Sequence, residues 1–216
     1  MKLIEVQTGI YERNDELAAQ LQQKLHRQGI QVINLLGTPG SGKTTMLEQL
    51  LQRLPKEQVA VIEGDLYTDR DAQRIASLGV QTLQLNTKGA CHLEAAMIAQ
   101  AVEQMDLTGV KYLIIDNIGN LVCTAEFKIG EDVRVALVSA AEGNDKPVKY
   151  PLMFQTADVV VLNKTDLLPY LNFDMEQFWQ DVRVINPDAI LIEACATQGK
   201  GVEEILQAAF KATLEF

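Results

Sequence analysis

A glycine-rich segment between an apolar run and a helical pattern constrains this chain more than any other feature. Residues 37–44 read Gly-Thr-Pro-Gly-Ser-Gly-Lys-Thr, which fits the phosphate-binding pattern G-x-x-x-x-G-K-[ST]. The apolar run at 32–36 precedes this segment and a helical pattern at 43–54 follows it, which is the strand–loop–helix context that the pattern requires. The sequence therefore predicts a P-loop fold that binds a nucleoside triphosphate.

The residue types of this loop match the chemistry of a phosphate site. Glycines let backbone N–H groups approach phosphate oxygens that a Cβ would block. Lys43 supplies a point charge to the β and γ phosphates, and the Thr44 hydroxyl is a ligand for Mg²⁺. The nucleotide-binding residues expected in this loop are Gly37, Gly40, Ser41, Gly42, Lys43, Thr44 and Thr45.

Apolar runs and helical patterns alternate along the chain. Leu17, Leu21 and Leu25 predict an amphipathic helix at about 14–28, capped by Asn14 or Asp15. Buried strands are expected at 32–36, 59–62, 112–115, 133–138, 159–162 and 190–192, and helices at 43–54, 69–78, 93–105, 175–185 and 202–212. This alternation predicts an α/β fold of the P-loop NTPase type, a mostly parallel sheet with helices on both faces. We expect residues 1–216 to form a single domain with its ligands at the carboxyl ends of the strands.

A second motif follows the strand expected at 112–115. Residues 116–119 read Asp-Asn-Ile-Gly and match D-x-x-G, in which the acid holds Mg²⁺ through water and the glycine N–H reaches the γ-phosphate. Asp116 is therefore a candidate magnesium residue, and Gly119 is a candidate sensor of hydrolysis. An acidic residue that simply ends a strand before a turn is the alternative interpretation of this motif.

A third motif indicates which base is bound. Residues 163–166 read Asn-Lys-Thr-Asp, which matches N-K-x-D, the guanine-recognition signature of GTPases. The Asp166 carboxylate can accept two hydrogen bonds from guanine, where adenine has no matching donors. Asn163 would contact the purine edge or tie this loop to the phosphate loop, and the Lys164 stem would cover the ring. The place of the later S-A-K element, which contacts the guanine oxygen, is taken by Cys195 and Ala196. GTP is the expected nucleotide.

Charge and cysteine content limit the partners. A net charge of -10 argues against a nucleic-acid partner, which would require a basic face. No apolar run approaches the ~20 residues that span a bilayer, and no secretory signal is evident at the start. Three irregularly spaced cysteines do not form a disulfide framework, so we expect a cytoplasmic protein with free thiols. No glutamine follows Gly119 to orient water and no arginine finger is apparent, so hydrolysis should be slow.

Several unusual motifs lie outside the general GTPase set. They are residues 63–65 (Glu-Gly-Asp), 71–75 (Asp-Ala-Gln-Arg-Ile), 91–93 (Cys-His-Leu), 119–123 (Gly-Asn-Leu-Val-Cys), 142–147 (Glu-Gly-Asn-Asp-Lys-Pro) and 149–151 (Lys-Tyr-Pro). In this order they closely resemble the hydrogenase-maturation nickel-insertion GTPases, the HypB-like family of SIMIBI-class P-loop GTPases. The chain departs from the family at Asp116, where glutamate is usual, and at Thr124, where proline usually follows the cysteine.

The resemblance implies a particular function. Members of this family are expected to be GTP-hydrolysing metallochaperones, so the resemblance implies that activity here. It also implies a homodimer whose assembly depends on GTP and metal. The implied partners are a nickel-delivery protein and the large subunit of [NiFe]-hydrogenase. The implied catalytic and magnesium residues are Lys43, Thr44, Asp65 and Asp116, with Asp65 as the switch I acid. The implied nickel or zinc ligands are Cys91, His92 and Cys123.

The metal site can also be judged from its chemistry. Adjacent residues on a regular helix point about 100° apart, so Cys91 and His92 need an irregular backbone to bind one ion. Thiolate and imidazole ligands suit Zn²⁺ or Ni²⁺ better than Mg²⁺. We expect a site shared between two chains, because one chain offers few close ligands. For a lone cysteine the common alternative is a small buried apolar residue, and we expect Cys195 to be one.

Two other functions remain open at this point. The chain would be a regulatory GTP-binding module if its cysteines were incidental. It would serve a different client if the nickel enzyme were urease, although residues 142–151 and the pair Cys91-His92 favour hydrogenase. Metal titration of the purified protein distinguishes the regulatory module from the metallochaperone.

Overall fold

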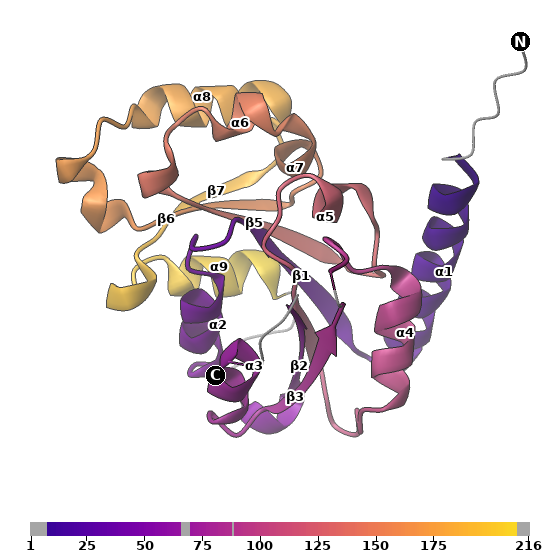
Figure 1. Cartoon of the computed structure of the whole chain (residues 1–216). Helices are drawn as coiled ribbons and strands as arrows, with labels where there is room; N and C mark the ends of the chain where they lie inside the picture. The colour runs from indigo at the N-terminus through magenta and orange to yellow at the C-terminus, as the bar shows by residue number, and fades with distance from the viewer. Residues whose placement is uncertain (1–7, 66–69, 88, 211–216) are drawn as a thin grey trace, which may run out of the picture.

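A parallel β-sheet forms the centre of the molecule (Figure 1). The computed structural model describes residues 8–65, 70–87 and 89–210. In these residues seven strands pair in the order β3-β2-β4-β1-β5-β6-β7, and every pairing is parallel. The strands are β1 (Gln31–Gly37), β2 (Val59–Asp65), β3 (Gln81–Asn86), β4 (Tyr112–Asp116), β5 (Val133–Ser139), β6 (Val159–Asn163) and β7 (Ile190–Glu193).

Helices cover both faces of this sheet, because the inner strands are apolar on both sides. On one face lie α2 (Lys43–Leu51), α3 (Arg70–Ala76) and α9 (Val202–Ala209). On the other lie α1 (Thr8–Arg27), α4 (Ala95–Glu103), α5 (Cys123–Glu126), α7 (Pro151–Gln155) and α8 (Met175–Ile185). A short α6 (Lys146–Lys149) contacts α7 and α8. Short 3-10 helices form η1 (Lys56–Gln58), η2 (Ala140–Glu142), η3 (Thr165–Tyr170) and η4 (Ala196–Gln198).

The predicted fold class is confirmed, and the six predicted strands are all present. The prediction missed β3, an edge strand whose apolar residues alternate with Gln, Thr and Asn and are only partly buried. It also gave no helix at α5, α6 or α7, each of which is shorter than six residues. Of the predicted helices, residue 69 and residues 211–212 lie outside the described part of the chain.

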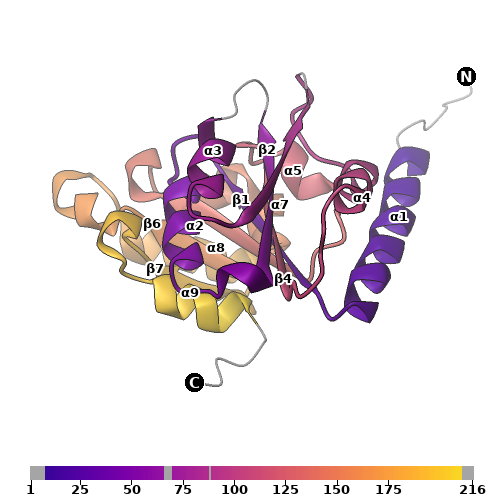
Figure 2. The same ribbon diagram turned by 90° about the horizontal axis from the view of Figure 1, so that it is seen from below.

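The N-terminal helix begins earlier than predicted. The chain is helical from Thr8 to Arg27, so Asn14 lies within α1 and does not cap it. The Asn14 side chain is buried and makes tertiary contacts, in which Nδ2 donates to the Lys128 carbonyl at 2.8 Å and Oδ1 accepts from the Ala95 N–H at 3.0 Å. Figures 1 and 2 both show α1 beside α4. These contacts, rather than capping, explain a polar residue at this position.

Across the described residues, no helix combines the length and the apolar character needed to cross a bilayer.

Candidate nucleotide and metal site

The glycine-rich loop connects the end of β1 to the start of α2. Gly40 and Gly42 have φ angles of 80° and 97°, which side chains rarely tolerate. A Cβ on Gly42 would lie 2.5 Å from the Asn163 Nδ2, and one on Gly37 would lie 2.4 Å from the Leu137 carbonyl oxygen. The backbone conformation therefore favours glycine at Gly40 and Gly42, and the lack of space favours it at Gly37 and Gly42.

A pocket of about 530 Å³ lies over this loop. Its walls come from the carboxyl ends of β1, β2, β4 and β6, as expected for a parallel sheet. The lining includes the predicted residues Gly40, Gly42, Lys43, Thr44, Thr45, Asp65, Asp116, Gly119 and Lys164. The buried Ser41 is not among them, and its hydroxyl donates to the Thr38 carbonyl at 2.8 Å.

Two buried carboxyl groups face each other in this pocket. Glu63 and Asp116 are register partners on β2 and β4, and both side chains are almost fully buried. Burial, followed by the proximity of Asp116, raises the pKa of Glu63 to about 10. Burial also raises the pKa of Asp116, although the Lys43 ammonium, 3.9 Å from Asp116 Oδ1, opposes the change. The uncharged form of Glu63 is therefore favoured when no cation is present.

The same pair fits a divalent cation. Glu63 Oε2 and Asp116 Oδ1 are buried and have no hydrogen-bond partner among the described residues, which is costly unless another group binds them. Carboxylate oxygens beside a phosphate cradle are the ligands that Mg²⁺ uses. Asp65 and the Thr44 hydroxyl line the same pocket. The prediction did not include Glu63 among the site residues, and its signal in the sequence was an acidic residue directly after an apolar strand.

The loop after β6 is tied to the phosphate loop. Asn163 Nδ2 donates to the Ser41 carbonyl at 2.8 Å, which is one of the two roles proposed for this residue. Lys164 has a φ of 60°, and its ammonium donates to the Gly40 carbonyl at 2.6 Å. The lysine stem therefore crosses over the phosphate loop.

Asp166 lies at the start of η3 and is exposed. It does not line the phosphate pocket, so the structure separates this predicted base-reading residue from the phosphate loop. The buried Cys195 thiol donates to Asp166 Oδ1 at 3.1 Å. The Ala196 N–H donates to Asn163 Oδ1 at 3.0 Å. Cys195 is thus buried, as predicted, and it also orients the carboxylate.

The loop after β4 leads from the phosphate pocket to α5. Gly119 packs closely on the phosphate loop, since a Cβ there would lie 3.0 Å from Pro39 Cγ. Asn120 pairs with Gly37 and accepts hydrogen bonds from the Val122 and Cys123 N–H groups at 2.7 and 3.2 Å. This loop is therefore fixed against the phosphate loop at Gly119 and, through Asn120, at the start of α5.

The three predicted metal ligands come together within one chain. One ligand atom from each of Cys91, His92 and Cys123 lies within 4.8 Å of the other two. Cys91 and His92 precede α4, where the backbone is irregular, and Cys91 Sγ is 3.7 Å from His92 Nδ1. A hydrogen bond with Cys91, together with burial, raises the pKa of Cys123. One chain therefore supplies three ligand groups, and the sharing of the site between two chains stays a prediction.

Two further residues support this cluster, and the prediction named neither. The Phe127 ring stacks on the His92 imidazole with centroids 4.0 Å apart and an angle of 16°. His92 Nε2 lies 3.4 Å from Glu94 Oε1 and makes no hydrogen bond of good geometry within the described part of the chain. A carboxylate on the outer nitrogen of a histidine is the usual support for a metal-binding imidazole. The motif His-x-Glu was the available signal for Glu94.

Together, the fold and the loop define a P-loop nucleotide-binding protein that carries a cysteine–histidine cluster beside its phosphate pocket. The family model for "CobW/HypB/UreG, nucleotide-binding domain" matches residues 31–193. The chain belongs to the CobW/HypB/UreG family.

Relatives with known names agree with this assignment. The chain is 45% identical over 207 residues to the hydrogenase maturation factor HypB of Escherichia coli K12, covering 95% of this chain and 71% of that protein. It is 43% identical over 185 residues to the hydrogenase/urease maturation factor HypB of Helicobacter hepaticus, covering 84% of this chain and 76% of that protein.

Solved structures show the same architecture. The crystal structure of HypB from Helicobacter pylori in complex with nickel has a TM-score of 0.85 and 37% identity, covering 94% of this chain and all of that one (100%). The signal recognition particle 54 kDa protein from Aeropyrum pernix has a TM-score of 0.57, 13% identity and coverage of 84% and 46% of the two chains. At that identity it shares the fold alone.

Proposed function

We propose that this protein is a GTP-hydrolysing metallochaperone that carries nickel for insertion into [NiFe]-hydrogenase. The observation that carries this proposal is the short connection between the two sites. Residues 119–123 begin against the phosphate loop and end at Cys123 in the cysteine–histidine cluster. A change at the γ-phosphate can therefore alter the position of a metal ligand.

In this proposal the phosphate pocket binds GTP and cleaves it slowly. Lys43 and the backbone N–H groups of the phosphate loop hold the phosphates. Thr44, Asp65 and Asp116, with Glu63 close by, would hold Mg²⁺, which supplies positive charge to the phosphates when bound. Asp166 reads the guanine, and Cys195 fixes its orientation. Asn120 stands where a water-orienting glutamine would be, so unassisted hydrolysis is slow.

The cysteine–histidine cluster holds the cargo. Two thiolates and one imidazole suit Ni²⁺ or Zn²⁺. The nickel complex of the Helicobacter pylori relative supports nickel. Three ligands leave a fourth position for a group from a second copy of this chain or from the client. We propose that two chains associate when GTP and metal are bound, and that a nickel-delivery partner and the hydrogenase large subunit act before and after this protein.

Urease is the second candidate client. The maturation factors of two Helicobacter species, which are 43% and 38% identical to this chain, carry the name hydrogenase/urease maturation factor. Activity of each enzyme in a host that lacks this gene distinguishes the two clients.

The proposal is tested by titrating nickel and zinc into the protein with a GTP analogue, with GDP and without nucleotide, while light scattering measures the mass. We expect tight binding that requires Cys91 and changes with the nucleotide. In the nucleotide-free titration, Cys195→Ala is the matched control, because Cys195 is a free thiol that is not in the cluster. Metal binding that survives Cys91→Ala and is equal in all nucleotide states would refute the proposal.

A further inference from the structure

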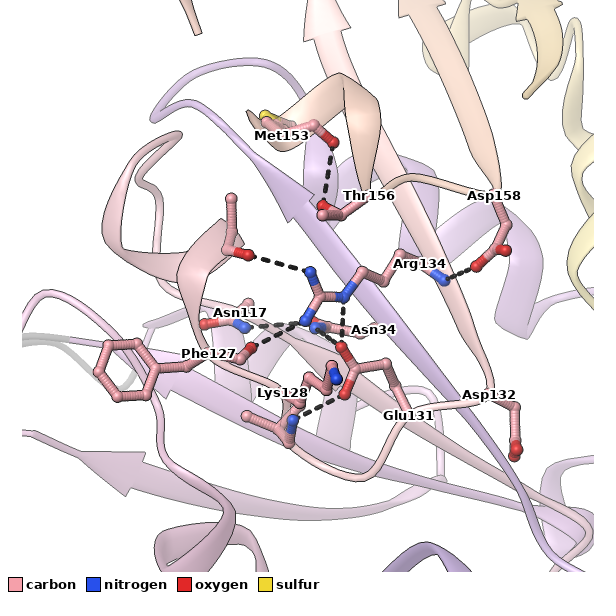
Figure 3. Close-up of polar contacts among 12 residues, drawn as sticks. Asn34, Asn117, Phe127, Lys128, Glu131, Asp132, Arg134, Met153, Thr156 and Asp158 are labelled. Carbon is pink, nitrogen blue, oxygen red and sulfur yellow. Dashed lines mark hydrogen bonds and ion pairs between the residues drawn. The ribbon is translucent and has the colours of Figure 1, made fainter. Parts of the chain in front are cut away.

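A buried arginine lies behind the metal cluster. The Arg134 side chain on β5 is only 9% exposed and forms an ion pair with Glu131, whose side chain is 6% exposed (Figure 3). Removing two charges from water is costly, and such a pair often stabilises a fold no better than apolar residues would. Stability alone therefore does not account for this pair.

The guanidinium contacts the segment that carries Cys123 of the cysteine–histidine cluster and Phe127, which packs on that cluster. Arg134 Nη1 donates to the Ala125 carbonyl at 3.0 Å, and Nη2 donates to the Phe127 carbonyl at 2.9 Å. Ala125 belongs to α5, which begins at Cys123, and the Phe127 ring is stacked on His92. One side chain thus fixes the backbone between a thiolate ligand and the residue that supports the imidazole ligand.

On its other side the pair is connected to the phosphate pocket. Asn34 is the register partner of Arg134 on the neighbouring strand β1, and its Nδ2 lies 3.5 Å from Glu131 Oε1. Asn34 Oδ1 accepts from Asn117 Nδ2 at 3.1 Å, and Asn117 lines the phosphate pocket directly after Asp116. Figure 3 shows this chain of contacts from Asn117 to Phe127.

We propose that Arg134 is a positioning residue for the metal ligands, and that Glu131 and Asn34 connect it to the loop that follows β4. The inference rests on the proposed function, since it assumes that the cluster binds metal. It adds a second connection between the two sites, through the sheet, to the direct one along residues 119–123. The buried chain is continuous and leaves few alternative arrangements for its members.

The first experiment removes the simultaneous hydrogen bonds of Arg134 to the Ala125 and Phe127 carbonyls and keeps the positive charge. Arg134→Lys can still pair with Glu131 but cannot bind both carbonyls. We expect nickel affinity to fall about tenfold in every nucleotide state, and the nickel–thiolate absorption band to shift. Arg183→Lys is the matched control, because Arg183 also donates to two backbone carbonyls, those of Pro187 and Ala189, at the end of α8.

The second experiment breaks the connection and leaves the metal side intact. Asn34→Leu has a similar shape but cannot bond Asn117 or Glu131. We expect nucleotide-free nickel affinity to stay within about twofold of wild type, while the ratio of nickel affinities with GTP analogue and with GDP changes by roughly threefold to thirtyfold. Asn186→Leu is the matched control, because Asn186 donates to the carbonyls of Phe154 and Ala157, away from both sites.

The outcomes separate this inference from the proposed function. If wild type and Cys91→Ala bind nickel equally, the metal site fails and the inference fails with it. If nickel binding requires Cys91 but neither variant differs from its control, only the positioning role is overturned. If Arg134→Lys does not fold, the test is the ratio of nickel affinities with GTP analogue and with GDP in Asn34→Leu. The same ratio as in wild type overturns the inference.

Discussion

The Asn163 side-chain amide donates to the Ser41 backbone carbonyl at 2.8 Å, across 122 residues of sequence. The same side chain accepts from the Ala196 N–H through its oxygen. Both contacts are buried, so neither donor nor acceptor has water as an alternative partner. One residue therefore holds together the phosphate loop, the end of β6 and the start of η4.

Asp166→Asn should change the base that is bound. The substitution replaces one acceptor with a donor, which opposes guanine and suits xanthine. A mismatched polar group costs about 1–3 kcal/mol, so GTP affinity should fall and xanthosine triphosphate affinity should rise. Calorimetric titration measures both, with Asp188→Asn as a control at another exposed aspartate. Equal GTP affinity in wild type and Asp166→Asn would refute the base-reading role.

Lys43→Ala should remove nearly all hydrolysis. The ammonium lies in the phosphate pocket, 3.9 Å from Asp116 Oδ1, and no other lysine in the described residues makes an ion pair with this acid. Loss of a positioned charge from a phosphoryl-transfer site costs roughly a hundredfold or more in turnover. Phosphate release under single-turnover conditions measures the effect, with the exposed Lys56→Ala as the control. Unimpaired turnover would mean that the phosphate site lies elsewhere.

Glu63→Gln should stabilise the metal-free protein at high pH. The pKa of Glu63 is raised from 4.5 to about 10 in the folded state, so the folded protein keeps a proton that the unfolded chain releases. The wild-type free energy of unfolding should therefore fall between about pH 5 and 9, by up to roughly 1.4 kcal/mol per pH unit, whereas glutamine cannot ionise. The advantage of Glu63→Gln should be absent below the unfolded pKa of 4.5.

Chemical denaturation across this pH range in the presence of a chelator measures the difference, and the exposed Glu57→Gln is the control. The same variant should weaken Mg²⁺-dependent nucleotide binding, because it removes a carboxylate from the pocket. A pH-independent difference between Glu63→Gln and wild type would show that this carboxyl is ionised in the folded state.

Glu94→Gln should weaken nickel binding while leaving GTP affinity unchanged. Glu94 Oε1 is 3.4 Å from His92 Nε2, and a neutral amide supports the imidazole less well than a carboxylate. Loss of such a partner typically costs about 10–100-fold in metal affinity. Competition with a chromophoric chelator measures this loss, and Glu103→Gln at the end of α4 is the control. Equal nickel affinity would leave Glu94 with no role in the cluster.

The parts of the site that were predictable from sequence are those in which a short segment needs particular residue types at fixed spacing. The phosphate loop needs glycine because Gly40 and Gly42 have positive φ angles. The strands rich in apolar residues were predictable, including β7 at the other edge of the sheet. The strand β3 was not predictable, because polar residues stand on both sides of each of its two leucines.

Two residues around the cysteine–histidine cluster, Phe127 and Arg134, had no such local signal. Phe127 and His92 are brought together only by the packing of α4 and α5 against the sheet. Arg134 is a charged residue within a largely apolar strand, and its contacts depend on carbonyl groups that the fold places beside it. Contacts of this kind follow from tertiary structure and cannot be inferred from spacing along the chain.

The position of Asn14 has a practical consequence for handling the protein. This residue joins α1 both to Lys128, directly after Phe127, and to Ala95, the first residue of the helix that follows His92. An affinity tag or surface linkage attached ahead of α1 could displace this helix, which contacts the segments that follow His92 and Cys123. The helix α9 packs on the opposite face of the sheet. Immobilisation for metal-binding measurements is therefore best made through the carboxyl end.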